Sequence, residues 1–200
     1  MGLDGLRPTA GGMLRVRRRP RNHNIRRPQL KDDRGETVLV GIISDTHDNL
    51  PAVELAARGF KERNVEVILH AGDIVAPFVA PVLAKAGAKV YAVFGNNDGE
   101  RAGLRKRFKE IGELKGDVAV VDLSGKKAAI YHGAEPAMSE ALIGCGGYDI
   151  VALGHSHAPL VEKRGRTLVI NPGECCGYLS GKKTIAIVDT ETMEPEIIEL

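Results

Sequence analysis

The 200-residue sequence predicts an α/β fold, and the order of its apolar segments carries that prediction. From Val38 to Glu110, short apolar runs alternate with helical patterns, an order that produces a parallel sheet with right-handed crossovers. After Glu110, strand-like runs are joined by turns that contain glycine, which is typical of antiparallel hairpins. The composition, with 43% hydrophobic and 27% charged residues, is that of a globular domain. We therefore expect a mixed β-structure, parallel in its first half and antiparallel in its second, with helices outside.

The first half contains three expected strands and three expected helices. The strands are apolar runs that end in polar loops, as buried strands do. They are residues 38–45, 65–73 and 88–98. The first helix has Asn49 as its cap and Pro51 in its first turn, and its apolar face would contain Val53, Ala56, Ala57 and Phe60. The other two helices are a short one at residues 77–87 and a charged one at residues 100–110.

The second half contains three expected hairpins, each with an x-Gly turn between two strand-like runs. They are residues 118–133, 159–173 and 178–189. One expected helix, near Glu135 to Ile143, interrupts them.

Five of the apolar runs end in side chains of the kinds that bind metal ions. Because ligands of open α/β sheets bind outside the carboxyl ends of the strands, these side chains should meet at one rim. Four of the six histidines lie in this set, and His155 and His157 would project to the same side of an extended backbone. The strand ends are Asp45-Thr46-His47, Gly72-Asp73, Gly95-Asn96-Asn97-Asp98, His132-Gly133 and Gly154-His155-Ser156-His157.

Each strand end also has a local explanation. Asp73 could cap a helix, Asn96 and Asn97 could form a turn, and His132 could pack in the core. Together, in order and in register with the strands, these residues predict a metal centre. His70 is out of phase with Asp73, and we interpret it as structural or as a support for the ligands.

The motifs Asp-x-His, Gly-Asp, Gly-Asn-x-Asp, His-Gly and Gly-His-x-His occur here in that order, and together they resemble the calcineurin-like metallophosphoesterase superfamily. The short form of the chain looks like the small single-domain phosphodiesterase branch of that family. The resemblance covers about Val38 to Leu200. It implies that the mixed sheets pack as a β-sandwich flanked by helices, with a dinuclear metal site at the carboxyl ends of the strands.

The resemblance also implies how the ligands are divided between two metal ions. Asp73 would bridge the ions with its two carboxylate oxygens, and two such ions lie ~3.5–4 Å apart. A site of imidazole and carboxylate ligands suits Mn²⁺, Fe, Zn²⁺, Ni²⁺ or Co²⁺. It suits Mg²⁺ and Ca²⁺ less well, because these ions are bound in all-oxygen sites. We expect two divalent ions, with Mn²⁺ first and Ni²⁺, Fe, Zn²⁺, Co²⁺ and Mg²⁺ as alternatives. One ion would be held by Asp45, His47 and His157, and the other by Asn96, His132 and His155.

The implied reaction is hydrolysis of a P–O bond by a metal-bridging hydroxide, which exists at neutral pH because metal coordination lowers the pKa of water from ~15.7 to ~7. Asp98 resembles the family's acidic residue that orients the side chain lying between that acid and the metal ions. In many relatives the residue before this acid is a histidine that protonates the leaving group. Here it is Asn97, which has no acidic proton to give. Asp98 and Asn97 are therefore the candidate catalytic residues, and acid assistance is in doubt.

The resulting expectation is a metal-dependent phosphodiesterase, a hydrolase acting on ester bonds, with a small phosphodiester or nucleotide-like substrate. One alternative is a nuclease acting on DNA or RNA, which only the basic N-terminal segment favours. Another is a non-enzymatic interaction scaffold of the same fold, as in the retromer subunit that resembles it but has lost metal ligands. Every expected ligand position is filled here, which disfavours the scaffold.

The N-terminal segment differs from the rest of the chain in charge. Residues 1–36 hold ten Lys and Arg against four Asp and Glu, whereas the other 164 residues hold 18 against 22. We expect residues 1–36 to be a basic, disordered extension and residues 37–200 to be the metallophosphoesterase domain. The segment has no apolar centre like that of a secretory signal, and the chain has no run of ~20 apolar residues for a membrane span. Three cysteines, including the adjacent Cys175 and Cys176, do not make a disulfide framework.

These features predict a cytoplasmic protein without a membrane partner. Binding of nucleic acid through the basic extension is not favoured, and a homo-oligomer is left open.

Overall fold

The computed structural model describes residues 37–200, and the following observations concern that part of the chain. The basic extension expected at residues 1–36 lies outside the described residues. Within residues 37–200, no helix is long and apolar enough to cross a membrane.

The first sheet has six strands in the order β11-β10-β1-β2-β3-β4. Strands β1 to β4 are parallel to one another, and β10 and β11 continue the sheet in antiparallel pairing beyond β1. The strands are β1 (Leu39–Ile43), β2 (Val67–His70), β3 (Lys89–Val93), β4 (Gly112–Gly116), β10 (Thr184–Asp189) and β11 (Pro195–Glu199).

The second sheet has five strands in the order β5-β6-β7-β9-β8. Its edges are the hairpins β5–β6 and β8–β9, as the sequence predicts, and its centre is parallel because β7 pairs with both β6 and β9 in that sense. In the first hairpin, Ser124 and Gly125 both have positive φ, as a type I′ turn requires. The strands are β5 (Val118–Leu123), β6 (Lys126–Tyr131), β7 (Ile150–Ala152), β8 (Pro159–Arg164) and β9 (Thr167–Pro172).

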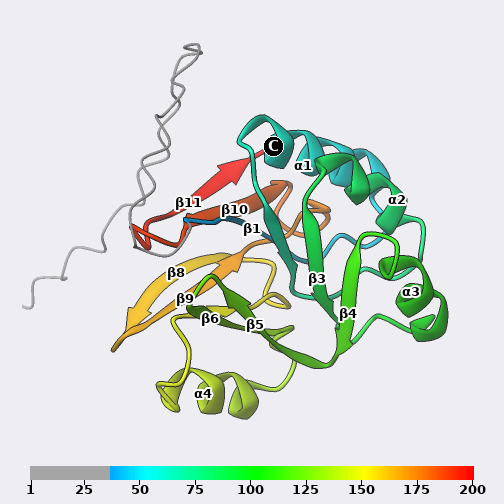
Figure 1. Cartoon of the computed structure of the whole chain (residues 1–200). Helices are drawn as coiled ribbons and strands as arrows, with labels where there is room; N and C mark the ends of the chain where they lie inside the picture. Colours follow the sequence, from blue (N-terminus) through cyan, green and yellow to red (C-terminus); the bar gives the residue numbers. More distant parts are fainter. Residues whose placement is uncertain (1–36) are drawn as a thin grey trace, which may run out of the picture. The chain divides into compact units, whose positions relative to one another are not determined.

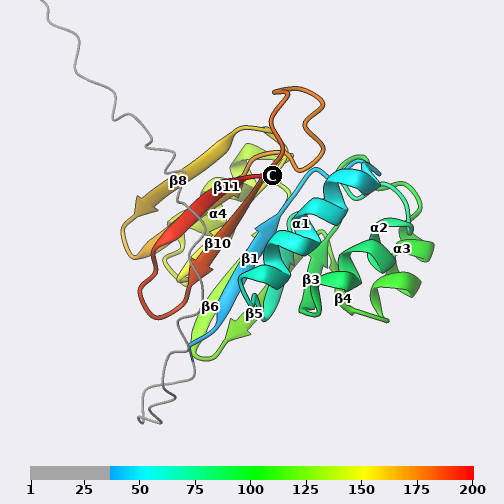
Figure 2. The ribbon, with the colours of Figure 1, turned by 90° about the horizontal axis from the view of Figure 1, so that it is seen from above.

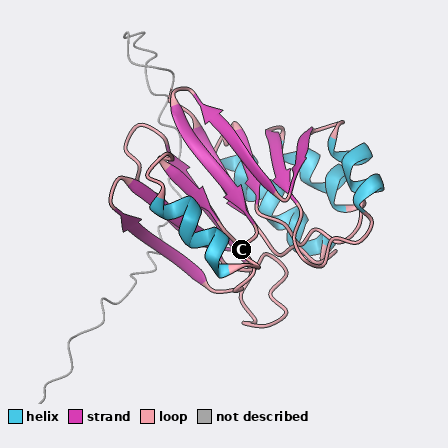
Figure 3. Cartoon of the chain, turned by 90° about the horizontal axis from the view of Figure 1, so that it is seen from below, coloured by secondary structure: helices cyan, strands magenta, loops and turns pink. Residues whose placement is uncertain are grey.

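Helices cover the outer face of each sheet (Figures 1 and 3). Helices α1, α2 and α3 lie together on one side of the strands, as the view from above shows (Figure 2), and α4 lies against the second sheet. Asn49 caps α1 as predicted, because its side-chain oxygen accepts a hydrogen bond from the amide of Ala52 at 3.2 Å. The helices are α1 (Leu50–Glu62), α2 (Val79–Leu83) with the 3₁₀ turn Ala84–Ala86, α3 (Arg101–Phe108) and α4 (Pro136–Gly144).

Alternate residues of the strands pack into different apolar layers, which makes the two sheets a sandwich. In β1, Val40 and Ile42 pack between the sheets, whereas Ile43 packs against the helices. In β6, Ile130 lies between the sheets and Ala129 lies in the layer that includes Ile143 of α4. The predicted fold class, mixed sheets in a β-sandwich flanked by helices, is confirmed.

Two details differ from the sequence-based expectation. The sequence predicts a hairpin at residues 178–189 with its turn at Ser180–Gly181, but residues 178–183 form a loop and only Thr184–Asp189 is a strand. The amides of Leu179 and Ser180 donate to the carboxylate of Glu174, so they are not free to pair with a strand. The edge strands β4 and β11 were not predicted, because each is short and largely polar or part-exposed.

Helix α1 approaches β1 closely because Gly41 has no side chain. A Cβ at position 41 would overlap the ring of the buried Phe60. We expect Gly41→Ala to lower the free energy of unfolding by ~1–3 kcal/mol, the usual cost of overpacking a core. Urea unfolding followed by circular dichroism measures the change. The matched control is Gly144→Ala, since a Cβ there meets open space. Equal stability of Gly41→Ala and the unaltered protein would contradict this packing.

Candidate metal centre

The carboxyl ends of strands from both sheets meet at one rim. The loops after β1 and β2 remain paired, because the amides of Asp45 and His47 donate to the carbonyls of Gly72 and Asp73, each at 3.0 Å. The loop after β9 joins them through the amide of Cys175, which donates to the carbonyl of Ser44 at 3.0 Å. The side chains predicted to gather at strand ends are thus brought together by backbone contacts between the loops.

Five of the seven candidate ligands have left-handed backbone conformations. A positive φ is uncommon for residues other than glycine and costs of order 1–3 kcal/mol, and such residues cluster at functional sites. The values of φ are 53° for Asp45, 39° for His47, 55° for Asp73, 67° for His155 and 57° for His157.

This backbone changes the expected geometry of the His155–Ser156–His157 segment. The two imidazoles do not project side by side from an extended strand. The His155 ring centroid lies 5.1 Å from that of His132, whereas the His157 ring centroid lies 5.4 Å from that of His47. The left-handed turns therefore direct the two histidines to different parts of the site.

The first group of ligand atoms surrounds a space near Asp45. Asp45 Oδ1 lies 3.4 Å from His157 Nε2 and 3.9 Å from His47 Nε2, and His47 Nε2 lies 3.5 Å from Asp73 Oδ2. Among the described residues, the buried atoms Asp45 Oδ1 and His47 Nε2 have no hydrogen-bond partner. Burial is the main influence on Asp45 and raises its pKa. A buried carboxylate oxygen without a partner is unfavourable, and a cation between these atoms would satisfy it.

The second group of ligand atoms lies around His132. Its Nδ1 lies 2.8 Å from the carbonyl oxygen of Ala71, which accepts the proton on that nitrogen and leaves Nε2 free to bind a metal. That Nε2 lies 3.0 Å from Asn96 Oδ1 and 3.3 Å from Asp73 Oδ2. The exposed His155 completes the group from the mouth of the site.

Asp73 connects the two groups through one oxygen atom. Its Oδ2 lies within 3.5 Å of both His47 Nε2 and His132 Nε2, whereas Oδ1 accepts a hydrogen bond from the amide of Asn97 at 2.8 Å. The expectation of one oxygen for each ion therefore differs from the observed orientation. Burial alone would raise the pKa of Asp73, but its contacts with His132 and Asn97 outweigh it and hold the pKa well below its usual range.

Asn97 and Asp98 lie in the loop after β3, but Asp98 does not face the position expected for it. Asn97 points toward the centre, since its side-chain amide donates to Asp73 Oδ2 at 2.7 Å. Both oxygens of the buried Asp98 instead accept hydrogen bonds from backbone amides, those of Asp73, Val75 and Gly95. Asp98 thereby ties the loops after β2 and β3 together, and its predicted role of orienting the side chain at position 97 stays a prediction.

His70 agrees with its interpretation as a structural residue. It is fully buried, and burial lowers its pKa to about 3. Its Nδ1 accepts a hydrogen bond from the amide of Gly72 at 3.2 Å, and its Nε2 lies 3.2 Å from Thr46 Oγ1. It thus holds the loops after β1 and β2 without contacting the ligand atoms.

Glu174, which directly follows the Asn-Pro-Gly segment at residues 171–173, is a site residue that the sequence analysis does not identify. Its side chain is fully buried, and its Oε2 lies 2.9 Å from His157 Nδ1. Burial would raise the pKa of Glu174, but hydrogen bonds from Ser180, His157 and Leu179 hold it well below its usual range. The carboxylate therefore accepts the Nδ1 proton of His157 and leaves Nε2 free for a metal.

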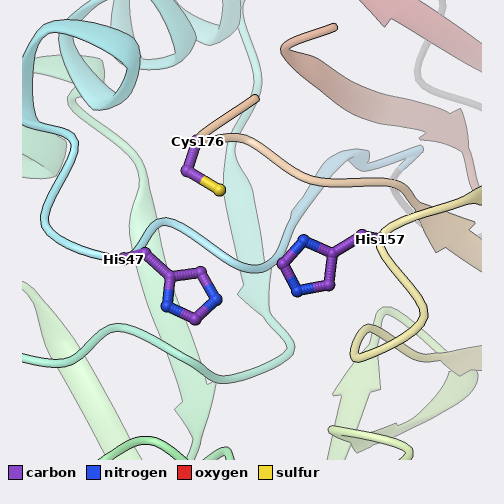
Figure 4. A group of neighbouring side chains, drawn as sticks. All are labelled: His47, His157 and Cys176. Carbon is purple, nitrogen blue, oxygen red and sulfur yellow. The ribbon is translucent and has the colours of Figure 1, made fainter. Parts of the chain in front are cut away.

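Cys176 was also missed as a site residue. Its sulfur and one ring nitrogen each of His47 and His157 lie within 4.8 Å of one another (Figure 4). Burial raises the pKa of this thiol to about 12. No local signal distinguishes Cys176 from the adjacent Cys175, which packs in the core.

Comparisons with known proteins agree on the family. Residues 38–193 match the sequence model of the calcineurin-like phosphoesterase superfamily domain. Phosphodiesterase MJ0936 of Methanocaldococcus jannaschii is 44% identical over 157 residues, which are 78% of this chain and 95% of the relative. Phosphodiesterase YfcE of Escherichia coli K12 is 29% identical over 143 residues, which are 65% and 75% of the two chains.

Solved structures extend this similarity to the fold. An archaeal phosphodiesterase with 42% identity superposes with a TM-score of 0.78 and covers 82% of this chain and 100% of its own. Vacuolar protein sorting 29 of Cryptosporidium parvum, with 19% identity, has a TM-score of 0.60 over 82% of this chain and 97% of its own, and it shows the fold alone. The resemblance found in the sequence motifs is confirmed.

The contact between Glu174 and His157 leads to a prediction about metal affinity. Removal of a group that orients a histidine ligand typically costs ~10–100-fold in affinity. We expect Glu174→Gln to weaken Mn²⁺ binding by that factor, because the amide carries no charge to hold the Nδ1 proton. Electron paramagnetic resonance of free Mn²⁺ during a titration measures it. The control is Glu140→Gln, an exposed acid paired with Arg164. An unchanged affinity of Glu174→Gln would show that this contact does not support metal binding.

Proposed function

The chain belongs to the calcineurin-like phosphoesterase superfamily, and on that premise we propose that it is a metal-dependent phosphodiesterase that hydrolyses a P–O bond of a small phosphodiester or nucleotide-like substrate. The observation that carries the proposal is the position of Asp73 Oδ2, close to His47 on one side and to His132 on the other. The 44% identity to a phosphodiesterase, over 95% of that relative, supports the diester class.

Members of this family use divalent metal ions, and the donor atoms described above fit two of them. We propose Mn²⁺ as the ion at both positions, with Ni²⁺, Fe, Zn²⁺, Co²⁺ and Mg²⁺ as alternatives, because the donors combine imidazole with carboxylate and amide oxygens. Bound divalent ions supply Lewis acidity, which activates water and offsets the charge of a phosphoryl group. One ion would be held by Asp45, His47, His157 and Asp73, and the other by Asn96, His132, His155 and Asp73.

Residues of the chain itself hold the candidate ligands in place and leave space for a substrate beside them. Asn97 donates to Asp73 Oδ2 and keeps that carboxylate aimed at both groups of ligands, but its amide cannot protonate a leaving group. Asp98 positions the loop that carries Asn96 and Asn97. An open pocket of about 210 Å³ adjoins the exposed His155.

The alternatives identified from the sequence are less well supported. Residues 37–200 carry more acidic than basic side chains, which disfavours binding of a polyanion such as DNA or RNA by this domain. The nuclease hypothesis depends on the basic residues 1–36, which we still propose to be an extension of the domain at residues 37–200. A scaffold would not need the complete donor set. The free cysteines Cys145, Cys175 and Cys176 agree with a cytoplasmic location, which we also propose.

Hydrolysis of bis(4-nitrophenyl) phosphate tests the function. We expect turnover that requires Mn²⁺ and is lost on exhaustive chelation. Asp73→Asn should reduce turnover by ~100-fold or more. Asparagine has no charge and only one acceptor oxygen, so it would hold the two ions less well, and the ions contribute several kcal/mol to stabilising the transition state. Asp122→Asn, an exposed acid in β5, is the control. Turnover that survives chelation would refute the proposal. Near-normal turnover of Asp73→Asn with both ions bound would instead refute the assignment of Asp73 as the ligand shared by the two ions.

The missing acid at position 97 predicts a strong dependence on the leaving group. General acid catalysis contributes ~10²–10⁴-fold when the leaving group is poor. We expect Asn97→His to raise the rate for diesters of simple alcohols while leaving nitrophenyl esters nearly unchanged, because the side chain at position 97 already faces the centre. The measurement is a leaving-group series on both proteins. Parallel slopes would show that position 97 is not directed at the leaving oxygen.

A further inference from the structure

A thiol lies beside the two imidazoles of the first group of ligands. Figure 4 shows the sulfur of Cys176 pointing toward the space between the rings of His47 and His157. Cys176 lies in the loop after β9, His47 in the loop after β1 and His157 in the loop after β7. Asp45, Asp73 and His132 form a second trio of possible ligands, and Asp45 adjoins both trios because its Oδ1 lies 3.4 Å from His157 Nε2. We propose that Cys176, His47 and His157 form a binding site for one thiophilic divalent ion of the Zn²⁺ or Cd²⁺ type, used in place of the two-ion arrangement.

The donor atoms suit such an ion. Zn²⁺ binds thiolate sulfur at ~2.3 Å and imidazole nitrogen at ~2.0–2.1 Å in tetrahedral geometry, which places ligand atoms ~3.5 Å apart. The three donor atoms lie within 4.8 Å of one another, so small side-chain movements bring them to that spacing. When the ion binds, a sulfur–metal bond replaces the S–H bond and the proton passes to water.

A fourth donor is already present. Asp45 Oδ1 is fully buried, has no hydrogen-bond partner within residues 37–200, and lies 3.4 Å from His157 Nε2. Two imidazoles, a thiolate and this carboxylate oxygen complete a tetrahedral set.

The thiol is held in place by hydrogen bonds within the chain. The amide of Cys176 donates to the carbonyl of Asp45 at 3.0 Å, and its own carbonyl accepts from Asn49 Nδ2 at 2.8 Å. Its sulfur lies 3.2 Å from Glu174 Oε2, the same oxygen that contacts His157 Nδ1 at 2.9 Å. One buried carboxylate thus orients both the thiol and an imidazole toward the same space.

A soft ion at this site competes with the two-ion centre. Thiolate selects Zn²⁺ and similar soft ions, whereas the oxygen-rich group around Asp73 suits Mn²⁺. Asp45, His47 and His157 would be common to both arrangements, so a thiophilic ion withdraws them from the space next to Asp73 Oδ2. This site rests on the proposed function only in sharing those three residues.

Cadmium absorption tests the site. In a Cys145→Ser background, which removes the exposed thiol, titration with Cd²⁺ should produce a thiolate-to-cadmium charge-transfer band in the ultraviolet that saturates at one ion per chain. Cys176→Ser in this background should abolish the band, and Cys175→Ala, which changes the adjacent buried thiol, should retain it. Absence of the band in the Cys145→Ser protein, or its loss only in Cys175→Ala, overturns the proposal.

Two further measurements separate the outcomes. Cadmium NMR of the Cys145→Ser protein reports sulfur and nitrogen ligands without any change at position 176, so the test does not depend on folding of Cys176→Ser. A shift typical of oxygen and nitrogen ligands alone overturns the proposal. Mn²⁺-dependent diester hydrolysis is measured on the same protein before cadmium is added. Hydrolysis without the band refutes the thiophilic site alone, and the band without hydrolysis supports this site while refuting the phosphodiesterase.

Discussion

The carboxylate of Asp73 is the contact on which the rest of the centre depends. Its Oδ2 meets His47, which follows a strand of the first sheet, and His132, which follows a strand of the second. The side chain is almost fully buried, and a negative charge there requires hydrogen-bond donors or cations. Asn97 supplies two donors, and a Cβ at Gly95 would overlap the carboxylate. A metal centre shared by the two sheets would therefore form where their rims converge on this oxygen.

Backbone strain and buried acids then set the orientation of the remaining ligands. Left-handed conformations at positions such as His155 and His157 cost of order 1–3 kcal/mol each, and the packed sandwich and the hydrogen bonds between loops maintain them. Asp98 binds backbone amides of two loops, and Glu174 binds His157, Cys176 and the amides that follow it. Asp98 and Glu174 thus hold neighbouring groups in place, whereas Asp45 and Asp73 supply negative charge among the candidate ligands. The candidate ligands are thus positioned by contacts within the chain itself.

The donor atoms around the rim differ in softness from one side to the other. Oxygen atoms predominate near Asp73 and Asn96, whereas sulfur and nitrogen meet near Cys176. Hard and soft ions favour different members of such a set. Metal availability would then influence which arrangement the centre adopts, with His157 belonging to both.

The sequence by itself determined the order of strands and helices, the Asn49 cap, the β5–β6 and β8–β9 hairpins and the polar residues at the strand ends, because these depend on local periodicity and turn chemistry. The family motifs were also local, and the comparisons confirm the family that they indicated. The edge strands β4 and β11, the loop at Tyr178 and the contacts of Asp98 were not predictable in this way. Only the tertiary structure decided that Asp73 presents one oxygen to both groups and that Cys176 lies beside His47, which is distant in the chain. Such contacts form when the two sheets pack face to face. Local sequence periodicity does not show which residues that are distant in the chain then meet.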